Sequence, residues 1–389
     1  MLHRDITDEF RVLLTEFPVV TVLGPRQSGK TTLVRQVLRD YAYSNLEVPE
    51  TRQLAASDPK AYLAGLEGRV IIDEIQRVPE LLSYIQVIVD EENRSGHFVL
   101  TGSHQLELSQ AITQSLAGRT AILNLLPFSI RELSCHGIGF DSFEDYCFNG
   151  FFPRIYDKSI RPGAAYANYY RTYVERDVRK LITLKDLSLF EKFLKLLAGR
   201  VGQLMDYSSL ANDVGVDAKT IRNWLSILEA SFIVFKLSPY FENFGKRVIK
   251  SPKYYFTHVG LVCFLLGIRN ASQVTRDPLV GSLFENLVVV ECLKSRFNMG
   301  AEPDLYFFRD SNHNEVDLLY QDGRDITAIE IKSAATFNPS LMKGLVKFKA
   351  KIPRVKRACL VYNGSPVEMS DGTSALHFKE VHKLFQGSG

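Results

Sequence analysis

Short apolar runs alternate with helical patterns through the first third of the chain. Residues 19–23 form an unbroken β-branched run, and residues 70–72 and 97–100 form similar runs that end in polar side chains. A run that is apolar on both faces suits a strand of a parallel sheet covered by helices. A helical pattern at residues 79–92 separates two of these runs. The alternation predicts a doubly wound α/β domain that closes near residue 127.

The pattern changes beyond that point. Aromatic-rich helical sequence is followed by two short helical patterns with a glycine between them, then by two apolar runs. The last part opens with a helix expected at 280–297, and strands are expected at 305–308, 315–320 and 326–331. We therefore expect a parallel-sheet domain, a helical connector, a winged helix-turn-helix unit and a second α/β domain, at residues 1–127, 128–200, 201–268 and 269–389.

Composition places the chain among ordinary globular proteins. Of 389 residues, 46% are hydrophobic and 23% are charged, which argues against a disordered or coiled-coil chain. The formal charge of +3 is too balanced to indicate nucleic-acid binding by itself. The five cysteines show no C-x-x-C pair, and the sequence contains neither a secretory signal nor an apolar stretch that would span a membrane. A cytoplasmic protein without membrane contact is the expectation.

A phosphate-binding motif follows the first strand. The sequence G-x-x-x-x-G-K-T lies between an expected strand and an expected helix, where such a loop belongs. Its glycines let successive backbone N–H groups converge on phosphate oxygens. Lys30 is expected to reach the β and γ phosphates of ATP, and Thr31 to offer its hydroxyl to Mg²⁺. The expected nucleotide-binding residues of this loop are Gly24, Pro25, Arg26, Gln27, Ser28, Gly29, Lys30, Thr31 and Thr32.

The ends of the later strands supply the other expected parts of an ATPase site. Asp73 is expected to hold Mg²⁺, and Glu74 to orient or deprotonate the attacking water. The alternative is that these two acids only cap the next helix. Thr101 and Ser103 are both candidates to sense the γ phosphate. Arg119 is a candidate arginine finger, in its own chain or toward a neighbouring subunit, or else a surface arginine.

These residues resemble the AAA+ superfamily of P-loop ATPases. The segments Gly-Pro-Arg-Gln-Ser-Gly-Lys-Thr, Asp-Glu-Ile-Gln-Arg-Val-Pro and Leu-Ala-Gly-Arg are similar to a prokaryotic branch in which the ATPase precedes a domain of unknown function, number 4143. Asn149 to Pro153 and Tyr173 to Val178 look like the start of that second region. The resemblance covers most of the chain and implies an ATPase more directly than it implies a biological role.

The glycine-containing region near residue 215 predicts a helix-turn-helix. Asp217 is placed to cap a second helix whose polar positions carry Lys219, Arg222 and Asn223. A basic stretch at 246–253 would lie near the following wing and could neutralise DNA phosphates. The alternative is a unit of the same shape that serves only packing or protein contact.

The last part of the chain predicts a second acidic site. If the strands at 315–320 and 326–331 form a hairpin, Asp317 and Glu330 converge on one Mg²⁺ or Mn²⁺, with Lys332 beside it and Glu285 completing the site. This order resembles the PD-(D/E)xK nuclease fold, except that Val316 stands where its fullest form has proline. The alternative is a charged surface hairpin with ordinary ion pairs.

Two functions remain open on sequence alone. The first is a Mg²⁺-dependent ATPase that binds duplex or branched DNA and couples its nucleotide state to a nuclease-like domain that cleaves or only binds DNA. The second is an ATP-dependent regulatory switch that acts on a protein partner and carries an inactive nuclease-like scaffold. A homo-oligomer is compatible with both.

Overall fold

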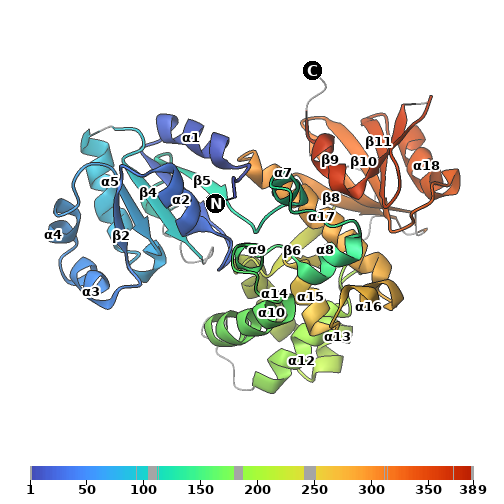
Figure 1. Cartoon of the computed structure of the whole chain (residues 1–389), viewed down its shortest axis with the longest axis horizontal. Coiled ribbons are helices and arrows are strands. Elements are labelled where there is room, and N and C mark those ends of the chain that lie inside the picture. The colour runs from blue at the N-terminus through green and yellow to red at the C-terminus, as the bar shows by residue number, and fades with distance from the viewer. Residues whose placement is uncertain are drawn as a thin grey trace.

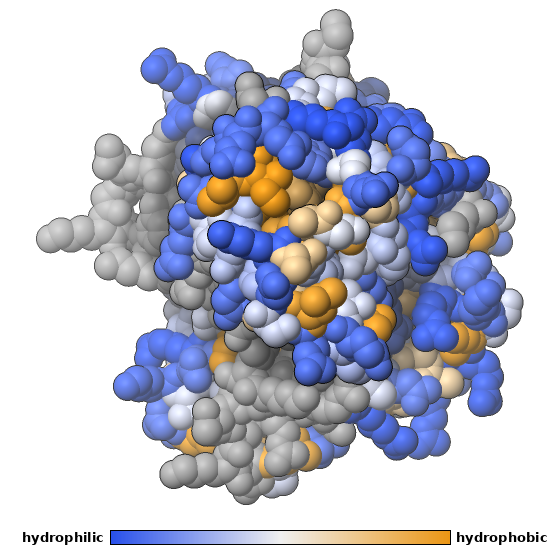
Figure 2. Space-filling view, turned by 90° about the vertical axis from the view of Figure 1, so that its left-hand side faces the viewer, coloured by the Kyte–Doolittle hydropathy of each residue, from blue (hydrophilic) through white to orange (hydrophobic). Residues whose placement is uncertain are grey.

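The computed structural model describes residues 2–92, 94–103, 112, 114–178, 187–240, 251–310, 312, 314–370 and 372–386. Within those ranges, no helix combines the length and the apolarity needed to cross a membrane. The N-terminal domain, the helical part and the C-terminal sheet lie around the long helix α17 (Figure 1). The face in Figure 2 is largely hydrophilic, with hydrophobic side chains in small separate groups.

The N-terminal domain is a five-stranded, all-parallel sheet in the order β2-β3-β4-β1-β5. All residues of β1 are buried because the strand lies between β4 and β5 and is covered on both faces. This confirms the α/β domain that the alternating pattern predicts. Its elements are α1 (Thr7–Glu16), β1 (Val19–Leu23), α2 (Lys30–Val37), β2 (Ala42–Asn45), α3 (Pro49–Ser57), α4 (Pro59–Ala64), β3 (Val70–Asp73), η1 (Ile75–Arg77), α5 (Leu81–Glu92), β4 (Phe98–Gly102) and β5 (Thr120–Asn124).

The middle of the chain is mainly helical and carries buried aromatic side chains. Tyr166, Tyr169 and Tyr173 are each at most 1% exposed, so they pack inside this part. The elements are α7 (Ile130–Cys135), α8 (Phe143–Asn149), α9 (Pro153–Asp157), α10 (Pro162–Tyr169), the π-helix η2 (Tyr170–Val178), α12 (Leu187–Ala198), α13 (Tyr207–Val214), α14 (Ala218–Ala230), β6 (Val234–Pro239), β7 (Lys253–Phe256), α15 (Val259–Leu265) and α16 (Ala271–Arg276).

The C-terminal part is built on an eight-stranded mixed sheet in the order β12-β13-β11-β10-β9-β8-β6-β7. The hairpin β6–β7 joins this sheet because β6 pairs in parallel with β8 at Ser238 and Tyr306. The elements here are α17 (Val280–Asn298), β8 (Leu305–Arg309), β9 (Glu315–Asp322), β10 (Asp325–Lys332), η4 (Pro339–Met342), α18 (Lys343–Lys351), β11 (Val355–Tyr362), β12 (Val367–Glu368), β13 (Thr373–His377) and η5 (Phe378–Leu384).

One hydrophobic core connects the two sheets. Val19 of β1, Phe152 before α9 and Phe284 of α17 belong to the same buried cluster. Helix α17 contacts β5 of the first sheet and β10 of the second. The two sheets are therefore packed into one continuous structure through this helix.

Candidate functional site

The phosphate loop needs glycine at both of its ends. Gly24 directly follows β1, and a Cβ atom there would lie 2.1 Å from the carbonyl oxygen of Leu125. Gly29 precedes α2 with φ at 95°, in the left-handed region that glycine adopts at little cost. The N-terminal end of α2 is thus presented at the carboxyl edge of the sheet, where its N–H groups are available to an anion.

Lys30 lies folded over its own loop. Its Nζ donates to the carbonyl oxygens of Gly24 and Pro25, each at 2.9 Å, and the residue is 6% exposed. Burial lowers the pKa of Lys30 to about 8, against the opposing effect of the Glu74 and Asp73 carboxylates. The ammonium is bonded to neutral oxygens of the loop, and negative phosphate oxygens would be stronger partners for it.

Asp73, at the end of β3, gathers hydroxyl groups from three elements. The Oγ1 of Thr31 donates to its two oxygens at 3.1 and 2.9 Å, and the hydroxyl of Tyr43 donates at 2.8 Å. Thr101 Oγ1 also donates to Asp73. Burial and the hydrogen bond to Asp73 raise the pKa of Tyr43 above its ordinary value. Thr31 and Asp73 together present hard oxygen donors, the ligand type that Mg²⁺ prefers.

Glu74 sits in a constrained backbone position beside Asp73. Its φ and ψ are 60° and 47°, an unfavourable left-handed conformation for a residue other than glycine. Its carboxylate accepts hydrogen bonds from Ser103 Oγ, at 3.2 Å, and from Gln76. The Glu74 side chain makes no capping hydrogen bond to η1, so the alternative reading of this acid as a helix cap is wrong.

The two sensor candidates contact different carboxylates. The Thr101 hydroxyl donates to the Asp73 carboxylate and accepts from the backbone N–H of Glu74 at 3.2 Å. The Ser103 hydroxyl instead donates to the Glu74 carboxylate. Both side chains are fully buried. Ser103 is therefore the one that touches the residue expected to handle water.

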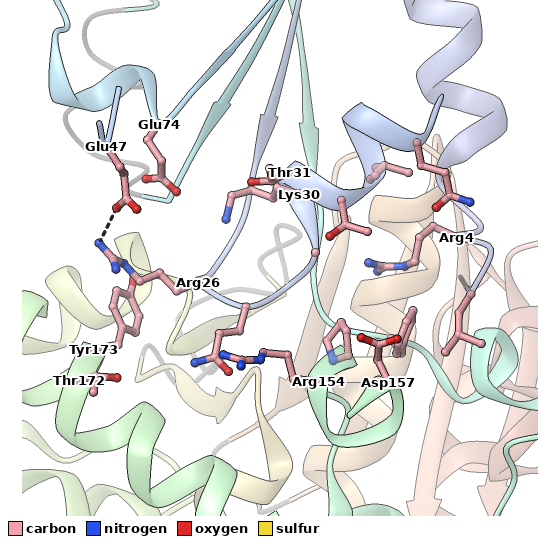
Figure 3. A pocket seen from close by; sticks show the side chains of 18 residues that line it. Arg4, Arg26, Lys30, Thr31, Glu47, Glu74, Arg154, Asp157, Thr172 and Tyr173 are labelled. Atoms are coloured by element: carbon pink, nitrogen blue, oxygen red, sulfur yellow. Dashed lines mark ion pairs between the residues drawn. The ribbon is translucent and has the colours of Figure 1, made fainter. Parts of the chain in front are cut away.

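A pocket of about 420 Å³ opens beside the loop. The loop and the start of α2 form one wall, while Leu2, Arg4 and Phe128 contribute from the N-terminus and the connection after β5. The opposite wall comes from the helical part, through Pro153, Arg154, Asp157, Thr172 and Tyr173 (Figure 3). This wall lies across the pocket from the phosphate loop.

Arg26 connects the loop to that wall. Its guanidinium lies 3.7 Å from Glu47 and 5.7 Å from the centre of the Tyr173 ring (Figure 3). Motif reasoning missed Arg154, Asp157 and Tyr173 as pocket residues because they lie more than 100 positions from the loop in the sequence. No local pattern marks them.

Arg4 holds the loop from behind and was also missed. It is 6% exposed and donates through NH1 to the carbonyl of Ser28 at 2.9 Å, through NH2 to that of Leu126 at 2.6 Å, and through Nε to Glu132 at 2.9 Å. A single arginine before the first helix carries no motif, so nothing in the sequence marks this contact.

The expectation that Arg119 acts as an arginine finger within its own chain is wrong. It precedes β5, and its carbonyl accepts from the N–H of Val19 at the start of β1. It therefore lies at the amino edge of the parallel sheet, whereas the phosphate loop lies at the carboxyl edge. Its guanidinium is bound to Asp90 at 2.5 and 2.8 Å. Two of the expected readings are left for this residue, an action toward another subunit and a surface arginine paired with Asp90.

The C-terminal carboxylates come together on a hairpin. Strands β9 and β10 pair antiparallel with Leu318 opposite Ile329, which places Asp317 close to Glu330. Lys332 Nζ lies 3.0 Å from Asp317 and 2.8 Å from Glu330. Burial lowers the pKa of Lys332, but the two carboxylates outweigh it and the net direction is upward. Burial and Asp317 raise the pKa of Glu330 to about 7.

Lys253 brings a second ammonium into this cluster from β7. It is 3% exposed, and its Nζ lies 3.1 Å from Glu285 of α17 and 2.7 Å from Glu315 of β9. Tyr255 donates to the same oxygen of Glu285 at 2.5 Å. Burial raises the pKa of Glu285 despite the opposing effect of Lys253.

The expected metal ligands are therefore divided between two lysines. Glu285 is paired with Lys253, whereas Asp317 and Glu330 are paired with Lys332. Among the described residues, no set of three or more His, Cys, Asp or Glu side chains is arranged to hold a metal ion. Glu285 does not complete a three-carboxylate site with Asp317 and Glu330 in this arrangement.

Two helices, α13 and α14, occupy the region where a helix-turn-helix was expected, with a glycine turn between them. Gly215 ends α13 with φ at 96°, and Asp217 accepts from Thr220 N at 2.8 Å at the start of α14. Lys219 and Arg222 are exposed on α14. Lys246, Arg247 and Lys250 lie outside the described residues. Lys253 is buried, so its expected contact with DNA phosphates is corrected.

Three family models match successive parts of the chain. An AAA domain matches residues 16–134, and the domains of unknown function DUF8612 and DUF4143 match residues 140–272 and 280–381. The segments Asn149 to Pro153 and Tyr173 to Val178 lie in the DUF8612 match, so their expected place at the start of domain 4143 is wrong. Among solved structures, the Walker-type ATPase PABY2304 of Pyrococcus abyssi is 14% identical, with a TM-score of 0.42 over 67% of this chain and 94% of that one. The AAA match and the geometry of the phosphate loop together identify this chain as an ATP hydrolase.

Curated relatives extend over nearly the whole chain. The uncharacterized proteins Rv2008c of Mycobacterium tuberculosis and Mb2031c of Mycobacterium bovis are each 31% identical over 368 residues, which is 93% of this chain and 80% of theirs. The uncharacterized protein MJ1637 of Methanocaldococcus jannaschii is 26% identical over 73% of this chain and 70% of its own. The chain belongs to the family of these mycobacterial proteins, with an AAA-type P-loop ATPase domain at its N-terminus.

Proposed function

We propose that this protein is a Mg²⁺-dependent ATPase that associates with DNA and couples its nucleotide state to a nuclease-like C-terminal domain. ATP binds along the loop with Lys30 on its terminal phosphates. Thr31 and Asp73 hold Mg²⁺, which neutralises phosphate charge when bound. Glu74, kept in position by Ser103, orients the attacking water. Arg154 is the positive side chain that the helical wall contributes to the pocket.

The observation that carries the coupling is a series of polar contacts from the loop to α17. Arg4 connects the Ser28 carbonyl to Glu132, whose carboxylate also accepts from the backbone N–H of Ser129, the N-cap of α7. Next to it, Ile130 N donates to Glu291 of α17 at 2.7 Å, and Lys294 of α17 donates to the carbonyl of Phe128 at 2.8 Å.

The N-terminal part of the same helix contributes to the acidic cluster of the C-terminal sheet. Glu285, on α17, is the partner of Lys253 in the acidic cluster. If nucleotide binding in the pocket displaces the 128–132 segment, α17 would move with it. That movement would reach the acidic cluster, because α17 also carries Glu285.

The DNA-facing part of the proposal rests on α12 to β7. Three helices followed by an antiparallel hairpin have the element order of a winged helix. Lys219 and Arg222 stand on the exposed side of α14, the helix that such units place against DNA. The fold of the last part, with Glu285 on a helix and Asp317, Glu330 and Lys332 on a hairpin, supports the nuclease-like assignment.

One observation favours the second candidate function, a switch with an inactive scaffold. The ammonium of Lys253 already neutralises Glu285 and Glu315 inside the cluster. A divalent cation would have to displace it. The C-terminal domain in this arrangement is therefore suited to binding rather than cleavage.

The deciding experiment measures ATP turnover and duplex binding together. We expect ATPase rates to change several-fold on adding duplex DNA, and duplex affinity to differ between ATP-bound Glu74→Gln protein and the ADP state. Reversing Lys219 and Arg222 to Glu should remove the effect, while Arg39→Glu, on an exposed position of the N-terminal domain, should not. Equal rates with and without DNA, and no DNA retention at low salt, would favour the switch.

Cleavage needs its own comparison. Plasmid and branched DNA are incubated with Mg²⁺ or Mn²⁺ and the wild-type, Lys253→Met or Glu330→Ala protein. Cleavage that appears only in Lys253→Met would show that the lysine suppresses a working centre. Equal nicking by wild-type and Glu330→Ala protein would place any cleavage elsewhere.

A further inference from the structure

The basic residues of this nearly neutral chain are concentrated in one C-terminal stretch. Between Glu330 and Glu368 the sequence contains no acidic residue. The same interval carries eight basic ones: Lys332, Lys343, Lys347, Lys349, Lys351, Arg354, Lys356 and Arg357. A formal charge of +3 for the whole chain conceals this local excess.

Helix α18 turns three of these lysines to one exposed side. Leu345, Phe348 and Ile352 are at most 6% exposed and pack the other side of this segment into the C-terminal core. Lys343, Lys347 and Lys351 follow each other at intervals of four and are all exposed. Side chains four apart lie above one another on a helix, so they form a row about 12 Å long.

This row does not serve the helix itself. Like charges at intervals of four destabilise a helix, and a lysine in the first turn opposes its dipole, as Lys343 does. Within the described residues, no ion pair joins any of the three lysines to a carboxylate. Against the opposing effect of burial, hydrogen bonds from Asn314 and the charge of Lys351 lower the pKa of Asp310, so Lys351 acts on one carboxylate. No ion pair within the described residues explains the charge of Lys343 or Lys347.

The acids nearest to the row are already engaged. A groove of about 410 Å³ separates α18 from the turn between β8 and β9, and Lys347, Lys351, Asp310 and Glu315 line it. Asp310 accepts from Asn314 Nδ2 at 2.8 Å, and Glu315 lies 2.7 Å from Lys253. Helix α18 lies at the outer edge of the molecule, away from the N-terminal domain (Figure 1), and its three lysines are exposed.

We propose that the lysine row of α18, continued by Lys356 and Arg357 at the start of β11, is a surface that holds the sugar-phosphate backbone of duplex DNA. The proposal deepens the DNA association proposed above and rests on it. A duplex carries one charge per about 1.7 Å of its axis with both strands counted, so a row of this length spans the axial distance of roughly seven phosphates, and each lysine can contact one of them.

The side chains of the row fix the kind of recognition. Lysine is a flexible point charge that contacts phosphates without reading bases, so binding here is independent of sequence. An anionic lipid surface fits less well, because a membrane-binding helix exposes a broad apolar face. On α18 that face is buried, and Val346, at 44%, is its large exposed hydrophobic residue.

Salt dependence provides the test. Fluorescence anisotropy of the full chain with a 25-base-pair duplex is recorded between about 50 and 300 mM KCl. Changing Lys343, Lys347 and Lys351 to Gln should reduce the slope of log Kd against log salt by about 2.7, since each neutralised phosphate contributes about 0.9. Kd should rise at least about tenfold at the lowest salt, equally for unrelated sequences.

Matched variants separate this surface from the other elements. Arg11, Arg39 and Arg94, three exposed basic residues of the N-terminal domain, changed to Gln remove the same charge and should leave the slope within about 0.5 of wild type. Lys219→Gln with Arg222→Gln reports on α14. Unchanged ATP turnover and circular dichroism confirm that each variant is folded.

The possible failures are distinct. If wild-type protein binds duplex and only the α14 variant loses affinity, the DNA association stands and the α18 surface is refuted. If wild-type protein binds no duplex at the lowest salt, both are refuted. Loss of binding to phosphatidylserine vesicles in the α18 variant, with duplex affinity unchanged, would assign the row to a membrane and also overturn the inference.

Discussion

Each sheet of this protein places a buried lysine beside carboxylates, and the two lysines are bound in opposite ways. Lys30 is held by two neutral carbonyl oxygens of its own loop, five and six positions away. Lys253 is held by the charged side chains of Glu285 and Glu315, from other elements. A lysine bonded to neutral oxygens forms stronger hydrogen bonds when a charged phosphate binds next to it. A lysine already neutralised by carboxylates loses its partners when it moves, at a large cost in a buried site.

The comparison shows that the groups bonded to a buried lysine determine whether it is available to a ligand or stabilises the fold. The lowered pKa of Lys30 reflects a buried ammonium without a bonded carboxylate. Burial also acts to lower the pKa of Lys253, but Glu285 and Glu315 outweigh it and the net direction is upward. Lys30 is suited to an incoming anion, whereas Lys253 stabilises the junction of β7, α17 and β9.

The strongest test of this contrast is Lys30→Ala. We expect ATP turnover to fall to background and nucleotide binding to disappear in calorimetry, because the terminal phosphates lose their charged donor. The thermal midpoint without nucleotide should stay close to that of wild type. An ATP affinity within tenfold of wild type would contradict the assigned role.

Lys253→Met should act in the reverse direction. Removing Lys253 leaves the buried Glu285 carboxylate without its ammonium partner, while Glu315 keeps the guanidinium of Arg309 at 2.9 Å. The free energy of unfolding should fall by about 3–5 kcal/mol. Urea unfolding measures the loss, while ATP affinity should not change. Adding Glu285→Gln should restore part of the stability. A Lys253→Met protein as stable as wild type would show that the pair is dispensable.

Glu74→Gln sharpens the first site. The amide keeps the size of the side chain and its contact with Ser103, but it does not accept a proton from water. Turnover should drop about a hundredfold or more, with ATP binding retained. Steady-state kinetics and calorimetry give the two values. An unchanged turnover would remove Glu74 from this role.

The smallest expected effect concerns Glu330 and pH. Its folded pKa of about 7 lies above the ordinary value of 4.5. The stability from its protonation is therefore fully present below about pH 4.5 and is lost as the pH rises through 7. The difference in unfolding free energy between wild type and Glu330→Gln should change by up to about 3 kcal/mol across this window, since a pKa difference of one unit corresponds to about 1.4 kcal/mol. A difference that stays constant with pH would rule out Glu330 as the titrating group.

The sequence predicted what contiguous residues and strand ends determine. The loop from Gly24 to Thr31 is a local motif, since backbone N–H groups of neighbouring residues make the anion site. Asp73 could be placed at the same edge because parallel strands end together. The pairing of β9 with β10 followed from alternation and a turn, so Asp317 and Glu330 could be brought close before the structure was known.

The positions of distant side chains depended on the tertiary fold. Arg119 looked free to reach the loop until the parallel register put it at the opposite edge of the sheet. Arg4 and the pocket wall around Arg154 come from segments with no motif of their own.

For this protein, the order of residues alone determined an ATP-binding loop, its acidic partners and the succession of helices and strands, because those features depend on neighbours along the chain. Whether a lysine meets a ligand, a carboxylate or solvent was decided only by packing. Lys253 became the internal cation of the acidic cluster because β6 joins β8 at the edge of the second sheet. That contact between remote strands leaves no periodicity or spacing in the sequence to reveal it.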